Sequence, residues 1–316
     1  MHGVALVLFR DGAGCAVALA DRCPHRNVPL ALGRCEQGQL RCAYHGWRFD
    51  GSGACTEVPG LVGDPASAAR HVDAYPTRER DGIVWVVPSR DAPILPEPPR
   101  LPHVRDGDYT TVRHRASLRA SVMAAVENAL DVPHTAFLHR GLFRGRRAPV
   151  AVEAVVRRGD GWVEAEYIGE PVPPGVVARL LAPEGGVVEH VDRFIVPSIA
   201  QVEYRLGASH LVVTTAFTPV DGDRISLHST VTFRSKLPAR LIAPLVTPIA
   251  RWILHQDARI LAAQHDNIRR FGGEHFASTP IDVLGPHIAR LLRRAERGAP
   301  LFVATDRGEE HVTLYV

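Results

Sequence analysis

The chain reads CPH at residues 23–25 and CAYHGW at residues 42–47, and each of these stretches supplies one cysteine and one histidine. Sixteen residues separate the first stretch from the second. A cluster of two irons can take both thiolates on one iron and both imidazoles on the other, which raises its reduction potential above that of an all-cysteine cluster. The spacing therefore predicts a Rieske [2Fe–2S] cluster. We expect its four ligands to be Cys23, His25, Cys42 and His45.

A structural zinc site is the main alternative, because cysteine and histidine also bind zinc tetrahedrally. A zinc finger usually groups its two cysteines and its two histidines separately, whereas here each loop carries one of each. Pro24 would stiffen the first loop and Gly46 would allow a tight turn in the second, while Trp47 suits either an aromatic cover or ordinary core packing. The pattern favours the iron–sulfur cluster. The remaining cysteines lack a partner spacing and are expected to be free thiols: Cys15, Cys35 and Cys55.

Length and composition are typical of a two-domain globular protein. The chain has 316 residues and a formal net charge of +3, which is too mild a bias to indicate binding to nucleic acid or to a membrane surface. No apolar run approaches the length of a membrane span. The opening MHGVALVLFRDG reaches Asp11 too early for a signal peptide, so a cytoplasmic location is expected.

The residue pattern changes near residue 90. Before it, short apolar or alternating runs separated by Gly and Asp turns predict a small antiparallel β domain. The segment PSRDAPILPEPPRLP then contains too many prolines for a helix or an inner strand. We predict a Rieske domain at residues 1–92, a proline-rich linker at 93–108 and a second domain at 109–316.

The second domain is predicted to be α+β, with an antiparallel sheet that holds a long helix. Helical spacing covers residues 118–130, and a longer helical pattern at 237–271 is interrupted by Pro244 and Pro248. The β-like runs between them lie at 150–156, 162–168, 187–195, 200–206, 211–217 and 225–233.

A second metal motif follows the first predicted helix. Pro133 ends that helix, and His134 and His139 follow where the backbone no longer dictates side-chain direction. Two histidines that need one carboxylate suggest the facial triad of non-haem Fe(II), which leaves positions open for O₂. Taken alone, the segment is equally typical of hydrogen-bonded surface groups at a helix end.

The third ligand is sought on the long helix. Asp257 shares a stripe with apolar residues at three- and four-residue spacing, so it is predicted to point inward, where an unpaired carboxylate is costly unless it meets a metal. A buried salt bridge is the alternative, although this face offers no obvious cation. Asp266 is the rival ligand, but its helical neighbours are typical of a solvated face.

In their order along the chain, these motifs resemble the α subunits of Rieske non-haem iron oxygenases. The resemblance covers the two cluster loops, the Asp131-to-His139 segment and the helix around Asp257. Glu127 and Asn128 before Asp131 make the pattern closest to the vanillate demethylase and pheophorbide oxygenase branch. The resemblance implies a Rieske domain followed by a helix-grip catalytic domain with one mononuclear iron, a head-to-tail homotrimer, and a separate NAD(P)H-dependent reductase or ferredoxin as electron donor. It also implies a strand or two before residue 1.

The implied reaction uses O₂ and external electrons to hydroxylate or oxidatively dealkylate an apolar or aromatic organic substrate, as a monooxygenase does. A cis-dihydroxylating dioxygenase and a non-catalytic Rieske electron carrier are the alternatives; the length of the second domain argues against the carrier. The candidate catalytic residues are Glu127, Asn128 and Asp131, and the resemblance implies that Asp131 reaches His45 of the partner subunit. A basic loop after His139 could border a subunit contact or an electron donor: Arg140, Arg144, Arg146 and Arg147.

Overall fold

We analysed a computed structural model, which describes residues 4–89, 97–139, 150–171, 188–235, 239–303 and 306–315. The chain forms two compact units, Met1–Arg100 and Leu101–Val316, and each is described by itself. Residues 93–96 of the predicted linker and the basic loop after His139 lie outside the described residues. Within the part of the chain that is described, no helix is both long enough and apolar enough to cross a membrane.

The first unit is built from short antiparallel strands, as its alternating runs predict. Within the described residues, one sheet has the order β1-β2-β7, a second has the order β3-β4-β5-β6, and β8 pairs with β9. The bounds are β1 Leu6–Arg10, β2 Ala16–Ala20, β3 Arg34–Glu36, β4 Gln39–Arg41, β5 Arg48–Phe49, β6 Cys55–Glu57, β7 Ala74–Tyr75, β8 Thr77–Arg80 and β9 Ile83–Val86, with short 3₁₀ turns at Leu30–Leu32 and Ala68–Arg70. The core of this unit packs Leu19, Leu30 and Phe49 against the buried cysteines.

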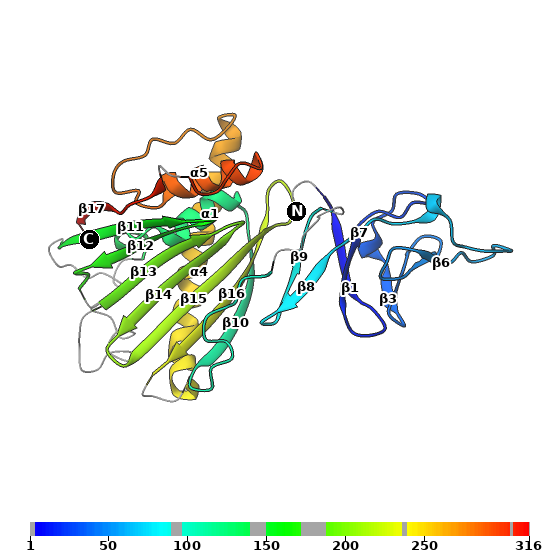
Figure 1. The fold of residues 1–316 in the computed structure, drawn as a ribbon, viewed down its shortest axis with the longest axis horizontal. Helices are drawn as coiled ribbons and strands as arrows, with labels where there is room; N and C mark the ends of the chain where they lie inside the picture. The colour runs from blue at the N-terminus through cyan, green and yellow to red at the C-terminus, as the bar shows by residue number, and fades with distance from the viewer. Residues whose placement is uncertain are drawn as a thin grey trace. The chain divides into compact units, whose positions relative to one another are not determined.

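The second unit contains a large antiparallel sheet (Figure 1). Within the described residues its order is β10-β16-β15-β14-β13-β12-β11-β17. The strands span β10 Thr110–Leu118, β11 Ala151–Gly159, β12 Trp162–Ile168, β13 Val188–Ile195, β14 Ile199–Leu206, β15 Ser209–Pro219, β16 Ile225–Arg234 and β17 Glu310–Tyr315. Sequential neighbours from β11 to β16 pair in meander fashion.

The helices of this unit are α1 Val122–Leu130, α2 Thr135–Leu138, α4 Ala239–Arg270 and α5 Gly285–Glu296. Helices α1, α4 and α5 share one apolar core with the inner face of the sheet. Helix α1 contacts β13, β14 and β15, while α4 contacts β10 and α5 contacts β12. Figure 1 shows the long α4 running along the sheet. The predicted α+β class, with an all-β first unit before a sheet that holds a long helix, is confirmed.

Two details of the helix predictions are wrong. Leu118 belongs to β10, where it pairs with Ile225, so α1 does not begin there. It begins after Ser121, whose hydroxyl accepts a hydrogen bond from the Ala124 amide at 3.1 Å and caps the helix. Helix α4 is not interrupted by its prolines, since Pro244 and Pro248 both lie inside it. A proline inside a helix removes one hydrogen bond and crowds the preceding turn, but the other turns of a long helix keep their hydrogen bonds.

A buried ionic cluster lies on the inner face of β13. The His190 ring stacks between Tyr167 and Tyr204, its cross-strand neighbours, at centroid distances of 4.7 and 4.1 Å. Its Nδ1 is 2.6 Å from a Glu170 carboxylate oxygen, and its Nε2 is 3.0 Å from Asp192. Burial alone would lower the pKa of His190, but the two carboxylates outweigh it and raise that pKa to about 9.

Candidate metal centres

The chain places two histidines at the two ends of one short helix. Helix α1 ends at Leu130, Asp131 leaves the helical conformation, and Pro133 allows a new turn to start at His134. His139 directly follows Leu138, the last residue of helix α2, and caps its C-terminal end. The two Nε2 atoms lie 3.3 Å apart, because one helical turn folds both rings to the same side.

Helix α4 brings the carboxylate to the same point. Asp257 Oδ1 lies 3.1 Å from His139 Nε2 and 3.8 Å from His134 Nε2. His139 is 1% exposed, and the side chains of Asp257 and His134 are 16% and 21% exposed. Among the described residues, this is the group of three whose ligand atoms all lie within 4.8 Å of one another.

The geometry fits a metal ion better than a salt bridge. Two nitrogen ligands at right angles, each about 2.1 Å from an ion, are about 3 Å apart, close to the spacing of the two Nε2 atoms. Asp257 Oδ1 is buried, and it has no hydrogen-bond partner in the part of the chain that is described. A buried, unsatisfied carboxylate oxygen is costly, and a cation would compensate it.

The pKa values of Asp257 and His134 are shifted by burial and by the charged groups that lie close to them. Burial raises the pKa of Asp257, while His139 and His134 oppose that rise. Burial alone would lower the pKa of His134, but Asp131 and Asp257 together raise it. Without a cation Asp257 and His134 thus hold their protons more tightly than they do in water, and a bound ion would displace those protons.

The other ring nitrogens of the two histidines are also engaged. His134 Nδ1 lies 2.5 Å from the backbone carbonyl oxygen of Asp131 and 3.3 Å from its carboxylate, which in turn accepts from the His134 amide at 3.2 Å. His139 Nδ1 lies 2.8 Å from Gln256 Oε1. The sequence reasoning missed Gln256, although its position directly before Asp257 was a usable signal.

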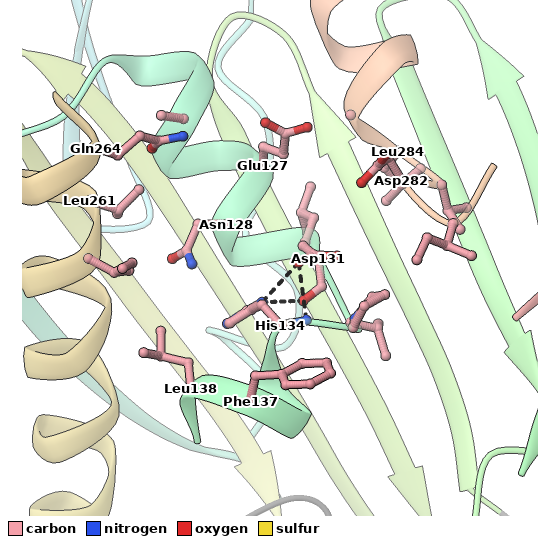
Figure 2. Close-up of a pocket in the computed structure, with 18 of the residues that line it drawn as sticks. Glu127, Asn128, Asp131, His134, Phe137, Leu138, Leu261, Gln264, Asp282 and Leu284 are labelled. Atoms are coloured by element: carbon pink, nitrogen blue, oxygen red, sulfur yellow. Dashed lines mark hydrogen bonds and ion pairs between the residues drawn. The ribbon is translucent and has the colours of Figure 1, made fainter. Parts of the chain in front are cut away.

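A pocket of about 980 Å³ opens beside His134 (Figure 2). The predicted residues Glu127, Asn128 and Asp131 line it from α1 and its end, and Gln264 faces them from α4. Phe137 on α2 also borders the pocket and is 73% exposed.

Acidic residues also line the pocket that Phe137 borders. Burial raises the pKa of Glu127, and nearby Asp282, Asp131 and Glu274 raise it further. Gly285 leaves room for the Glu127 carboxyl, because a Cβ there would lie 2.1 Å from Glu127 Oε1.

Two residues of α4 test the face predicted for this helix. Asp266 pairs with Arg119 at 2.5 Å, and its side chain is 52% exposed, in accord with the solvated face predicted for it. Ile260 lies three residues after Asp257, but it is half exposed at the pocket. The inward face of helix α4 therefore includes Asp257 and Leu261.

In the first unit, the two motif cysteines are buried side by side. Cys23 and Cys42 are both nearly inaccessible to solvent, and each starts a tight turn: the Asn27 amide donates to the Cys23 carbonyl and the Gly46 amide to the Cys42 carbonyl. Gly46 has a φ of +71°, which glycine adopts without strain. Burial raises the pKa of Cys23 to about 11, so this thiol needs a bound metal to become a thiolate.

The two motif histidines form a second pair at the outer side of the same loops. The rings of His25 and His45 are 4.4 Å apart at their centroids. Trp47 stacks on His25 at 4.6 Å, and Tyr44 contacts His45 at 3.8 Å. His25 Nδ1 is a buried nitrogen without a hydrogen-bond partner among the described residues. A thiol pair beside an imidazole pair is the donor set of a Rieske cluster. The other three cysteines, Cys15, Cys35 and Cys55, form no disulfide, in accord with the free thiols predicted for them.

Comparisons with known proteins agree with this geometry. The Rieske [2Fe-2S] domain matches residues 1–76, and the vanillate O-demethylase oxygenase C-terminal domain matches residues 118–298. The chain belongs to the Rieske oxygenase family. This Rieske oxygenase accordingly has two cofactors, a Rieske [2Fe–2S] cluster and a mononuclear iron.

Named relatives place the family match in context. The oxygenase component of dicamba O-demethylase from Stenotrophomonas maltophilia is 34% identical over 56% of this chain and 51% of its own length. Protein TIC 55 from Arabidopsis thaliana is 30% identical over 80% of this chain and 46% of its own. The chain thus spans about half the length of these curated relatives. The crystal structure of dicamba monooxygenase bound to dicamba shares the fold, with a TM-score of 0.78 at 23% identity over 93% of this chain and 91% of that one.

Proposed function

We propose that the protein is the oxygenase component of a Rieske monooxygenase system, which uses O₂ and externally supplied electrons to hydroxylate or oxidatively dealkylate an apolar or aromatic organic substrate. The observation that carries the proposal is the convergence of two imidazoles and the buried Oδ1 of a carboxylate in a chain that also holds a Rieske donor set. A protein that only carried electrons would not need the group formed by His134, His139 and Asp257.

The proposed ligands divide between the two units. Cys23, His25, Cys42 and His45 would hold the [2Fe–2S] cluster, and His134, His139 and Asp257 would hold the mononuclear iron. When bound, the cluster supplies one electron at a time and the iron supplies open positions at which O₂ is reduced beside the substrate. The dicamba O-demethylase relative supports oxidative demethylation as one such reaction.

The chain's own residues prepare the iron site. His134, His139 and Asp257 would supply three ligands and so leave coordination positions of the iron open for O₂. The Asp131 carbonyl fixes the His134 ring through Nδ1 at 2.5 Å, which leaves Nε2 as the ligand atom. The exposed Phe137 gives the adjacent pocket an apolar wall.

We propose that the protein assembles as a head-to-tail homotrimer in which Asp131 meets His45 of the partner subunit. Two surface properties support this assembly. The pocket beside Asp131 combines the carboxylates of Glu127 and Asp282 with the exposed Phe137. The cluster loops offer the complement, because Tyr44 is 63% exposed and Arg26 is an exposed cation. Opposite charges and apolar rims of this kind favour docking.

Other parts of the proposal concern partners, bounds and location. The electron donor would be an NAD(P)H-dependent reductase or a ferredoxin. The domain bounds stay as predicted, with a Rieske domain at 1–92, a linker at 93–108 and a catalytic domain at 109–316; the family matches at 1–76 and 118–298 support this division. A cytoplasmic location likewise stays a prediction, to be checked by cell fractionation.

The test is turnover with ¹⁸O₂ in the reconstituted system. Candidate substrates are first screened for those that accelerate oxidation of the reduced cluster, and the product is then analysed by mass spectrometry. One labelled atom per product supports the monooxygenase, whereas two labelled atoms would assign the chain to the cis-dihydroxylating dioxygenases instead. A protein that contains the cluster but binds no third iron would refute the oxygenase proposal.

A further inference from the structure

Both ring nitrogens of His139 contact side chains of consecutive residues on helix α4. Asp257 Oδ1 lies 3.1 Å from its Nε2, and Gln256 Oε1 lies 2.8 Å from its Nδ1. Successive side chains on an α-helix project about 100° apart, so two neighbours can bracket one ring only if it points at the helix between them. The ring is buried at 1% exposure, which makes these contacts a large part of its surroundings.

We propose that Gln256 is a positioning residue for the mononuclear iron: its side-chain oxygen accepts the Nδ1 proton of His139 and so leaves the Nε2 lone pair directed at the metal. This inference rests on the proposed function, because it takes His139 as an iron ligand. A neutral imidazole carries one proton, and the nitrogen that carries it cannot bind a metal. An acceptor at Nδ1 therefore selects the tautomer that binds iron through Nε2.

The comparison with His134 shows why a side chain is needed at this position. The Nδ1 of His134 meets a backbone carbonyl, that of Asp131, at 2.5 Å. His139 closes helix α2 on the far side, and its Nδ1 faces α4, whose own carbonyls are used within the helix. A long side chain with a terminal acceptor fills that role, and Gln256 provides one.

The amide also keeps the charge of the site low. The three proposed ligands comprise two neutral imidazoles and one carboxylate, so they bring one negative charge to a divalent cation. A glutamine adds an acceptor without adding a second buried carboxylate next to Asp257, whose pKa burial already raises. The acceptor role itself does not require neutrality, and a glutamate at position 256 should perform it too.

The experiment measures the affinity of the full-length protein for Fe²⁺ and Co²⁺ at the mononuclear site by competition with a chelator. Gln256→Met and Gln256→Leu remove the acceptor and keep an apolar side chain of similar size. Gln256→Glu keeps an acceptor, and His255→Leu is the matched control at an exposed neighbour. The Rieske absorption spectrum and the thermal unfolding midpoint report whether each variant is folded.

We expect both apolar variants to bind the ions about 10- to 100-fold more weakly than the wild type, the range that follows loss of a partner outside the metal ligands. Gln256→Glu and His255→Leu should stay within about threefold of the wild type. Wild-type affinity in the folded Gln256→Met or Gln256→Leu protein would overturn the inference. Equal weakening in Gln256→Glu would also overturn it, since a packing defect rather than a lost acceptor would then be responsible.

These outcomes are distinct from a failure of the proposed function. If the wild type itself binds no ion beyond the cluster, or if His134→Ala binds as well as the wild type, the iron site is refuted. If the wild type binds an ion that His134→Ala does not, and the Gln256 variants bind it equally well, only the role of Gln256 is refuted.

Discussion

The Asp131→Asn substitution separates electron transfer from iron binding. Asp131 offers His134 two acceptors, the backbone carbonyl at 2.5 Å and the carboxylate at 3.3 Å, and it also accepts from the His134 amide. Asparagine keeps the carbonyl and a side-chain oxygen for the amide, so the His134 ring stays anchored. Iron affinity should therefore fall by less than the tenfold at which loss of an outer partner becomes evident.

The carboxylate is expected to matter more for the proposed contact with the partner subunit. A hydrogen bond to a charged group contributes about 1.5–3 kcal/mol, against about 0.5–1.5 kcal/mol for a neutral one. Replacing the charged acceptor therefore costs about 1–1.5 kcal/mol, which is about a five- to twelvefold loss of the docked, electron-conducting arrangement. Cluster oxidation in Asp131→Asn should be slower than in the wild type by at least this factor.

The assay is a single turnover in which the reduced protein is mixed with O₂ and substrate and the Rieske absorbance is followed by stopped flow. Iron content is measured on the same samples. Asp266→Asn is the control, because Asp266 is an exposed carboxylate of α4 paired with Arg119. A wild-type rate in Asp131→Asn would remove Asp131 from the electron path. Loss of the third iron would instead show that Asp131 is required to hold the metal.

The remaining predictions concern the ligands and the buried ionic cluster. His134→Ala should empty the mononuclear site and abolish turnover while the Rieske absorption and EPR signals stay intact, whereas Cys42→Ser should remove the cluster; loss of all three irons in both variants would contradict separate sites. Metal analysis should show that Asp257→Ala loses the lone iron and that Asp266→Ala keeps it; the reverse result would reassign the third ligand. Because the pKa of His190 is raised from 6.5 to about 9, its stabilising effect is complete below pH 6.5 and is lost as pH rises through 9. His190→Gln should flatten that decline in unfolding free energy, and an unchanged pH profile in chemical denaturation would refute it.

Local pattern alone was enough for most of the strands and for the long helix. The run at 162–168 became β12 with the predicted bounds, and the helical pattern at 237–271 became Ala239–Arg270. Alternation and helical periodicity are properties of neighbouring residues, so they can be recognised in the sequence without knowledge of the fold. The start of α1 was missed because Leu118 satisfies a helical period and a strand equally well. Its pairing with Ile225, more than a hundred residues away, decided the matter.

The candidate sites divide in the same way. Cys23 and His25, like His134 and His139, lie so close in sequence that their residue types and spacing indicate metal chemistry by themselves. The helical stripe also indicated Asp257 rather than Asp266 as the third ligand of the iron. Each of these inferences needs only a short segment and its period.

What only the tertiary structure decided is how these segments meet. The approach of Asp257 to within 3.1 Å of His139, the stacking of Trp47 on His25 and the contact of Gln256 with the outer nitrogen of His139 all join residues from separate elements. Such contacts depend on how helices and loops pack against a common core, and that packing is determined by the whole set of buried side chains at once. A sequence pattern reports which face of an element is buried, but not which atom of another element lies opposite it.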